Sequence, residues 1–348
     1  MTSIEKVDKN FKVETNIQKD DIKFYNPEEK PFKIYGVFKE NGCFRRMPES
    51  VAKNVSEGVF YHHINTAGGR IKFKTDSKYV AVNVKLSQKS KMPHIPFTGS
   101  IGLDMYDGVK YVKTFVPPIS VEDSFEGVID FEDEKMHDVT INLPTYSGVS
   151  EIYIGLSENA KILESEPYKN KKPIVYYGSS ITQGGCASRP GNSYQAIIER
   201  RNNLDYINLG FSGSAKAEDE MIDYIKNLDM EIFVYDYDHN APTVEYLENT
   251  HKKMFDKIRE KHPTLPIIMM TKPKYEQTEY AVKFKNVIQK TYDEAIKNGD
   301  KNVYLLDGQE LMKIAKYDGT VDGCHPNDLG FFSMAKAVGD VIEKILNK

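Results

Sequence analysis

Four short segments of this 348-residue sequence carry side chains suited to acyl-transfer chemistry. The first, G-S-S-I-T-Q-G at residues 178–184, follows an apolar run that predicts a β-strand. A serine in the turn between a strand and a helix exposes its hydroxyl above the sheet edge, and its own N–H points toward the atom that the hydroxyl attacks. A plain Gly/Ser connection between two elements explains this segment equally well when it is taken alone.

The second segment is G-F-S-G-S at residues 210–214, again directly after a predicted strand. Glycine lets the backbone approach a ligand closely and present a free N–H. The segment does not match the G-x-S-x-G turn of α/β-hydrolases, because Ser214 stands at the last position. Turn glycines without a functional role are the simpler interpretation of this segment by itself.

The third segment, D-Y-D-H-N at residues 236–240, follows another predicted strand. The amide of Asn240 can donate a hydrogen bond to an oxyanion. Metal ligation is the alternative, since two carboxylates and an imidazole are plausible ligands; they belong to Asp236, Asp238 and His239. Residues 62–63 are both histidine, but neighbouring side chains on a strand point opposite ways and cannot complete such a site together.

The fourth segment is D-G-C-H-P-N at residues 322–327. Asp322 is three residues before His325, which in a turn can bring the carboxylate to the ring. The carboxylate would fix the tautomer and leave the other ring nitrogen free as a general base. Pro326 and Asn327 also mark a helix start, so a capping role is available. Together the four segments supply a nucleophile, a base, an orienting carboxylate and oxyanion donors.

The secondary structure predicted around these segments places all four of them at one edge of a sheet. Strands are predicted at residues 173–177, 206–209, 232–235, 266–270 and 303–306, and helices at 193–201, 217–228, 244–261, 281–298 and 328–346. Alternating strands and helices predict a mostly parallel sheet covered on both faces. Ligands of such sheets bind outside the carboxyl ends of the strands, where all four segments fall.

The N-terminal half has a different pattern. Short β-like runs occur at residues 70–75, 79–86, 99–106, 111–115, 137–143 and 151–156. Several alternate apolar and polar residues, and Asp107-Gly108 predicts a tight hairpin between two of them. Many short strands without a long helical pattern predict a β-sandwich or jelly roll. We therefore expect an accessory domain over residues 1–165, which includes most of a polar linker at 157–172, and a catalytic domain over 166–348.

The composition of the chain limits the kinds of partner that we expect for the protein. With 47 basic and 51 acidic residues the formal charge is −4, which predicts no nucleic-acid partner. No run of about 18 apolar residues predicts a membrane span, and the polar N-terminus lacks the apolar core of a secretory signal, so a cytoplasmic location is expected. Three cysteines are too few for a disulfide framework or a zinc knuckle. The sequence leaves a homo-oligomer open.

The order of these motifs resembles that of the SGNH (GDSL-type) hydrolases. That family has G-D-S-I-T, an oxyanion glycine, an oxyanion asparagine and a C-terminal D-x-x-H-P block, and this chain has G-S-S-I-T at 178–182 and D-G-C-H-P at 322–326. Residues 102–106, G-L-D-M-Y, are similar to the G-x-D-L-Y motif of a jelly-roll domain that precedes some SGNH domains. The resemblance implies a three-layer α/β/α hydrolase with a flavodoxin-like parallel sheet, preceded by the all-β domain. We interpret Asp104 and Tyr106 as structural residues of the sandwich.

The resemblance also implies roles for particular residues. Ser180 is the expected nucleophile, His325 the general base and Asp322 its orienting carboxylate. The amides of Ser180 and Gly213 and the side chain of Asn240 form the expected oxyanion hole. Two departures from the family pattern concern Ser179, which replaces the usual aspartate, and the D-Y-D-H-N context of the asparagine, which replaces G-x-N-D.

The implied activity is that of a serine esterase acting on short-chain acetyl esters, on carbohydrate, without a cofactor. Its substrate would be a small-molecule or oligosaccharide ester. An acyltransferase with the same triad, a sugar-binding protein with an inactive hydrolase domain and a metallohydrolase are the alternatives. We expect Arg189 to contact a polar substrate group, with a surface salt bridge as the alternative. Sugar sites often stack rings on Trp, which the chain lacks, although 22 Tyr and 17 Phe could serve.

Overall fold

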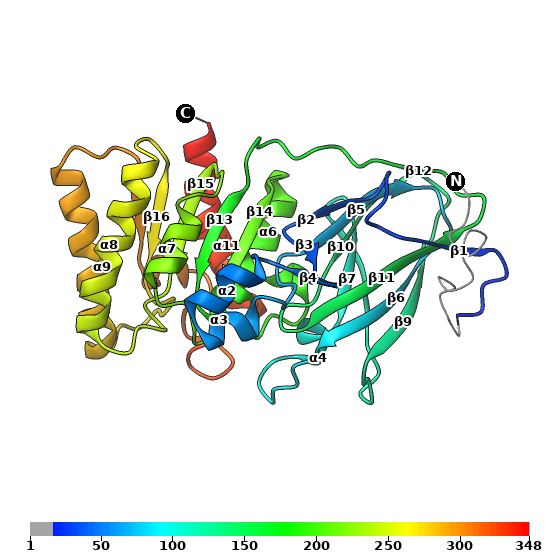
Figure 1. Ribbon diagram of the computed structural model, residues 1–348, viewed down its shortest axis with the longest axis horizontal. Coiled ribbons are helices and arrows are strands. Elements are labelled where there is room, and N and C mark those ends of the chain that lie inside the picture. Colours follow the sequence, from blue (N-terminus) through cyan, green and yellow to red (C-terminus); the bar gives the residue numbers. More distant parts are fainter. Residues whose placement is uncertain (1–16, 348) are drawn as a thin grey trace. The chain divides into compact units, whose positions relative to one another are not determined.

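The computed structural model describes residues 17–347, shown as ribbons in Figure 1. They form two compact units, which divide between Pro167 and Tyr168, close to the expected boundary after residue 165. Two further stretches belong to the unit on the other side of that division: residues 47–63 to the second unit and Arg189–Gly191 to the first. Most of the polar N-terminal stretch in which we predict no secretory signal lies outside the described residues. No helix within the described residues is long and apolar enough to cross a membrane.

Two antiparallel sheets make up the first unit. One has the order β1 (Ile22–Tyr25), β11 (Gly148–Ser157), β6 (Tyr79–Gln88) and β9 (Ser124–Asp130). The other has the order β12 (Ile162–Leu163), β5 (Arg70–Thr75), β10 (His137–Asn142), β7 (Leu103–Asp107) and β8 (Lys110–Phe115), with β2 (Lys33–Tyr35) also on β5. A small hairpin joins β3 (Phe38–Glu40) and β4 (Cys43–Arg45). Alternate residues of both sheets, such as Val82 and Phe73, share one buried core, which confirms the sandwich.

The predicted strands of this unit differ from the structure in several places, and strands β1, β2, β3 and β4 were not predicted. Residues 99–106 are not one strand, because the short helix α4 (Phe97–Ser100) precedes β7. Strand β9 was not predicted; its buried residues Phe125 and Ile129 are separated by three half-buried residues, one of them a glycine, so its pattern is weak. Strand β12 lies within the stretch expected to be only a linker. The Asp107-Gly108 hairpin is confirmed, with Gly108 at φ +57°.

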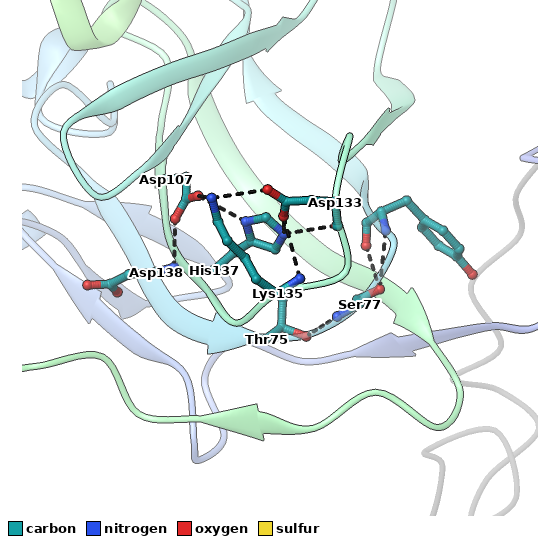
Figure 2. A network of polar contacts seen from close by, with 8 residues as sticks. Thr75, Ser77, Asp107, Asp133, Lys135, His137 and Asp138 are labelled. Carbon is teal, nitrogen blue, oxygen red and sulfur yellow. Dashed lines mark hydrogen bonds and ion pairs between the residues drawn. The ribbon is translucent and has the colours of Figure 1, made fainter.

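A buried histidine fixes one end of the second sheet (Figure 2). His137 begins β10, is 2% exposed and stacks on Phe131 with ring centroids 3.6 Å apart. Its Nδ1 atom lies 2.9 Å from Oδ2 of Asp107, and its Nε2 atom lies 3.3 Å from Oδ1 of Asp133. Asp107 Oδ1 also accepts the N–H of Asp138 at 2.9 Å. The Asp107 carboxylate therefore ties the end of β7 to the start of β10.

We expect Asp107→Ala to destabilise the first unit by about 1–3 kcal/mol, because it leaves the buried His137 ring nitrogen without its partner. Asp133→Ala is the matched control, and its effect should be smaller because the Asp133 side chain is half exposed. Urea unfolding followed by circular dichroism measures both. Equal losses for the two variants would contradict the role given to Asp107.

A five-stranded parallel sheet is the centre of the second unit. Its order is β14 (Tyr206–Gly210), β13 (Ile174–Gly178), β15 (Ile232–Asp236), β16 (Ile267–Met270) and β17 (Val303–Leu306). Counted along the chain, this is the order 2-1-3-4-5 of flavodoxin-like sheets. The predicted alternation of strands and helices is confirmed, and the strand predicted at 303–306 matches β17 in both bounds.

Helices cover both faces of this sheet (Figure 1). One face packs against α2 (Glu49–Val55), α3 (Glu57–His62), α7 (Asp219–Ile225), α8 (Val244–Lys261) and α9 (Glu279–Lys297). The other packs against α6 (Tyr194–Asn202) and α11 (Asp328–Leu346). Val175 and Tyr177 of β13 face the first set, whereas Ile174 and Tyr176 face the second. This alternation establishes the expected three-layer α/β/α architecture.

Candidate active site

The turn after β13 brings a serine hydroxyl to a histidine. Helix α5 (Ser180–Gln183) begins at Ser180, and the Ser179 side chain caps it by accepting the N–H of Ile181 at 3.2 Å. Ser180 Oγ lies 2.9 Å from Nε2 of His325. A hydroxyl at this distance can pass its proton directly to the imidazole as it attacks a carbonyl.

The turn before α11 orients the histidine ring. Asp322 Oδ2 lies 2.7 Å from His325 Nδ1, while its Oδ1 accepts the N–H groups of Cys324 at 2.9 Å and His325 at 2.7 Å. The capping role suggested by the sequence is also present, because Asn327 Oδ1 accepts the N–H of Gly330 at 3.0 Å. One turn thus starts α11 and aims the imidazole at Ser180.

Hydrogen bonds keep the Asp322 carboxylate charged. Burial would raise the pKa of Asp322, but donation from the His325 and Cys324 N–H groups and from the His325 ring outweighs it and lowers the pKa to about 2. The ionised carboxylate accepts a hydrogen bond from Nδ1–H of His325 at any physiological pH. The tautomer that leaves Nε2 free to take a proton from Ser180 is thereby favoured.

The expected oxyanion donors follow three neighbouring strands. Ser180 follows β13, Gly213 follows β14 and Asn240 follows β15, and β13 lies between the other two. Gly213 has φ +66°, and its N–H has no hydrogen-bond acceptor within residues 17–347. Asn240 Nδ2 donates to the carbonyl of Phe211 at 3.0 Å, which leaves its second N–H available. All three therefore follow the carboxyl ends of adjacent strands, and their joint action as an oxyanion site stays a prediction.

The segment 236–240 contacts three of the loops around it and holds no converging ligand set. Asp238 Oδ2 accepts the N–H of Lys272 at 3.0 Å, and His239 Nδ1 lies 3.7 Å from Cys324 Sγ. Asp236 Oδ1 lies 2.5 Å from Thr182 Oγ1. Because these three side chains point to three different loops, their ligand atoms do not form a convergent group in the described part of the chain. The metal-ligation alternative for this segment is therefore not supported.

Burial sets the charge state of this segment. Burial raises the pKa of Asp236 to about 8, and the nearby Asp238 carboxyl adds to the rise. Burial likewise raises the pKa of Asp238 to about 6. It lowers the pKa of His239 to about 3, assisted by the positive charges of Lys272 and His325. At neutral pH both Asp236 and His239 are therefore uncharged.

Arg189 is held by side chains of the first unit. Its guanidinium lies 3.2 Å from Oδ2 of the fully buried Asp104, contacts the hydroxyl of Tyr106 and lies 3.9 Å from the centroid of Tyr111. Asp104 Oδ2 also accepts the N–H of Gly191 at 2.9 Å. These are the Asp and Tyr of the G-L-D-M-Y motif, which thus bind Arg189 and Gly191. Arg189 does form an ion pair, but with a fully buried carboxylate and not as the surface salt bridge of the alternative interpretation; a substrate contact stays a prediction.

Sequence reasoning did not find the pairing of Thr182 with Asp236. The two residues lie 54 positions apart, and no motif spacing connects them. The available signal was only general: both residues occupy segments at the carboxyl ends of neighbouring parallel strands. Side-chain contacts between such segments depend on strand register, which the sequence did not specify.

Two family profiles match the chain. Residues 171–343 match the GDSL-like Lipase/Acylhydrolase family, and residues 22–162 match the N-terminus of Esterase_SGNH_hydro-type proteins. Together they span most of the sequence. The protein belongs to the GDSL-like lipase/acylhydrolase family and is an SGNH-type esterase with a GxDLY N-terminal domain. A search of curated proteins found no match.

Solved structures resemble the chain over nearly its full length. A protein from Bacteroides ovatus ATCC 8483, provisionally assigned as a GDSL-like lipase, is 28% identical over 94% of this chain and 98% of its own, with a TM-score of 0.83. A salicylyl-acyltransferase from a tetracycline biosynthetic pathway is 20% identical over 94% and 98%, with a TM-score of 0.74. A family two carbohydrate esterase from Clostridium thermocellum, in complex with cellohexaose, is 15% identical over 82% and 94%, with a TM-score of 0.60. The last two similarities concern the fold.

We predict that Asp236 makes stability depend on pH. An unfolded aspartate has a pKa near 3.9, whereas burial raises the pKa of Asp236 to about 8. The folded state keeps a proton that the unfolded state has lost, so this contribution is full below about pH 4 and declines until about pH 8. Asp236→Asn cannot ionise and should show a flatter decline in unfolding free energy between pH 5 and 8 in urea titrations. Identical slopes for wild type and variant would contradict the protonated state.

Proposed function

We propose that the protein is a serine esterase that removes acetyl and other short acyl groups from carbohydrate esters through Ser180, His325 and Asp322. The observation that carries the proposal is the continuous contact from Ser180 Oγ to His325 Nε2 at 2.9 Å and from His325 Nδ1 to Asp322 Oδ2 at 2.7 Å. Within a family of esterases, this arrangement is suited to forming a covalent acyl-enzyme.

The reaction proceeds in two steps. His325 Nε2 takes the Ser180 proton as Oγ attacks the ester carbonyl, and the oxyanion accepts hydrogen bonds from the Ser180 and Gly213 N–H groups and the Asn240 amide. His325 then returns the proton to the departing alcohol oxygen, which leaves Ser180 acylated. Water attacks the acyl-enzyme with His325 again as base, and the acid is released. Asp322 stays ionised throughout and stabilises the imidazolium.

Two considerations support a carbohydrate ester as substrate. The resemblance to SGNH enzymes with a G-x-D-L-Y domain implies acetylated sugars, and a structurally similar carbohydrate esterase was solved with cellohexaose. The chain has no Trp on which a sugar ring could stack, so Tyr and Phe would have to supply such a platform.

A second candidate function is acyl transfer to an alcohol. It uses the same triad and differs only in the group that attacks the acyl-enzyme. The similarity to the salicylyl-acyltransferase, over 94% of this chain with a TM-score of 0.74, favours keeping it. Partition of the acyl group between water and an added polyol acceptor distinguishes the two: an esterase gives free acid, and a transferase gives the new ester.

We expect the wild-type protein to release acetate from acetylated xylan, mannan or cello-oligosaccharides and from p-nitrophenyl acetate. Ser180→Ala should reduce all of these rates to the uncatalysed background, because it removes the hydroxyl that lies 2.9 Å from His325 Nε2. Ser150→Ala, which removes an exposed hydroxyl of the first unit, is the control and should leave them unchanged. Hydrolysis by Ser180→Ala above background would rule out this nucleophile.

A further inference from the structure

A buried carboxyl group that the two-step mechanism does not use lies directly against the nucleophile turn. Asp236 is the last residue of β15 and pairs in register with Gly178, the last residue of β13. We propose that Asp236 is a positioning residue for acyl transfer, whose Oδ1 atom anchors the turn around Ser180 and so sets the Ser180 hydroxyl against His325. The inference rests on the proposed role of Ser180 as nucleophile.

One carboxyl oxygen holds both sides of the nucleophile. Oδ1 of Asp236 lies 2.5 Å from the hydroxyl of Thr182, two residues after Ser180, and accepts a longer hydrogen bond of 3.4 Å from the N–H of Ser179, the residue before it. Ser180 lies between two residues held at one point. The two contacts fix the backbone from which the Ser180 side chain projects toward His325.

Two further hydrogen bonds hold the turn after Ser180 through the main chain of Thr182. The carbonyl oxygen of Thr182 accepts hydrogen bonds from Asn208 Nδ2 and Gln195 Nε2, each at 2.7 Å. Thr182 therefore has its main chain fixed by β14 and α6 and its side chain fixed by β15. The contact with Asp236 comes from the end of β15, the strand that Asn240 follows.

The Asp236 carboxyl group is closely packed. Asp236 is 4% exposed, and Ser179 and Thr182 are fully buried. A Cβ atom at Gly178 would lie 1.8 Å from Asp236 Oδ1 and 2.4 Å from Thr182 Oγ1, so the strand can end here only with glycine if the carboxyl is to reach the turn. In an interior packed this closely, loss of the anchor shifts its neighbours. A displacement of about 1 Å at a reacting group can cost about 10²-fold in rate.

A role in stability alone is the competing explanation, since any buried hydrogen-bonded carboxyl supports the fold. The contacts of Asp236 favour a role in positioning as well, because they are made to residues on both sides of Ser180. The titratable groups facing Asp236 are Asp238 of the same segment and Tyr194 of α6. Ser179 stands where the G-D-S-I-T pattern has an aspartate, and in this chain the carboxyl group that contacts the turn belongs to the neighbouring strand.

Two matched pairs of variants test the proposal. Thr182→Val removes the donor hydroxyl with little change of shape, whereas Thr182→Ser keeps it. Asp236→Ala removes the acceptor, whereas Asp236→Asn keeps an acceptor oxygen. We expect Thr182→Val and Asp236→Ala to lower kcat on p-nitrophenyl acetate by roughly 10- to 100-fold per folded molecule, with KM within about threefold. The two conservative variants should keep kcat within about threefold of wild type.

Folded fraction from circular dichroism normalises every rate, so a variant that merely unfolds is recognised. If Asp236→Ala does not fold, Thr182→Val alone decides the outcome. An unchanged kcat per folded molecule for Thr182→Val, or equal losses for Thr182→Val and Thr182→Ser, would overturn the positioning role. Equal rates for wild type and Ser180→Ala would instead overturn the proposed function and this inference with it.

Discussion

The contact between Ser180 and His325 joins two turns that are 145 residues apart in sequence, and the acyl transfer that we propose depends on it. It exists because β13 ends at the same sheet edge at which α11 begins. Helix α11 buries residues such as Val338 and Ile342 in the core that also contains Ile174 and Tyr176 of β13. The burial of apolar side chains far from the turn therefore determines where the imidazole lies.

Three acidic side chains at this edge have different environments and so different pKa values. Asp322 is partly exposed and accepts three hydrogen bonds from its own turn, which lower its pKa and keep it ionised beside the base. Asp236 and Asp238 are buried, and burial raises the pKa of each. A charge is thus maintained where the reaction forms an imidazolium, and Asp236, beneath the nucleophile turn, remains neutral near pH 7.

Local patterns predicted much of this structure, and tertiary contacts account for what they missed. Residues 244–261 and 328–346 form helices with the predicted bounds, because each has a clear apolar face and a capping residue, Thr243 and Asn327. The predicted site residues lie at the carboxyl edge of the sheet because parallel topology places every strand end there.

The helices at residues 49–62 gave no comparable signal, and they pack into the second unit although they lie among the strands of the first in sequence. The binding of Arg189 by Asp104, and of Thr182 by Asp236, depends on the register of side chains far apart in sequence, which no short motif encodes.

Covalent labelling of the intact protein with a fluorophosphonate tests the central claim most directly, since the reagent reacts with serine hydroxyls activated by a neighbouring base. We predict one adduct per chain, mapped by peptide mass spectrometry to Ser180, and a loss of labelling in His325→Ala. An adduct on another residue, or labelling that does not depend on His325, would contradict an imidazole-activated Ser180.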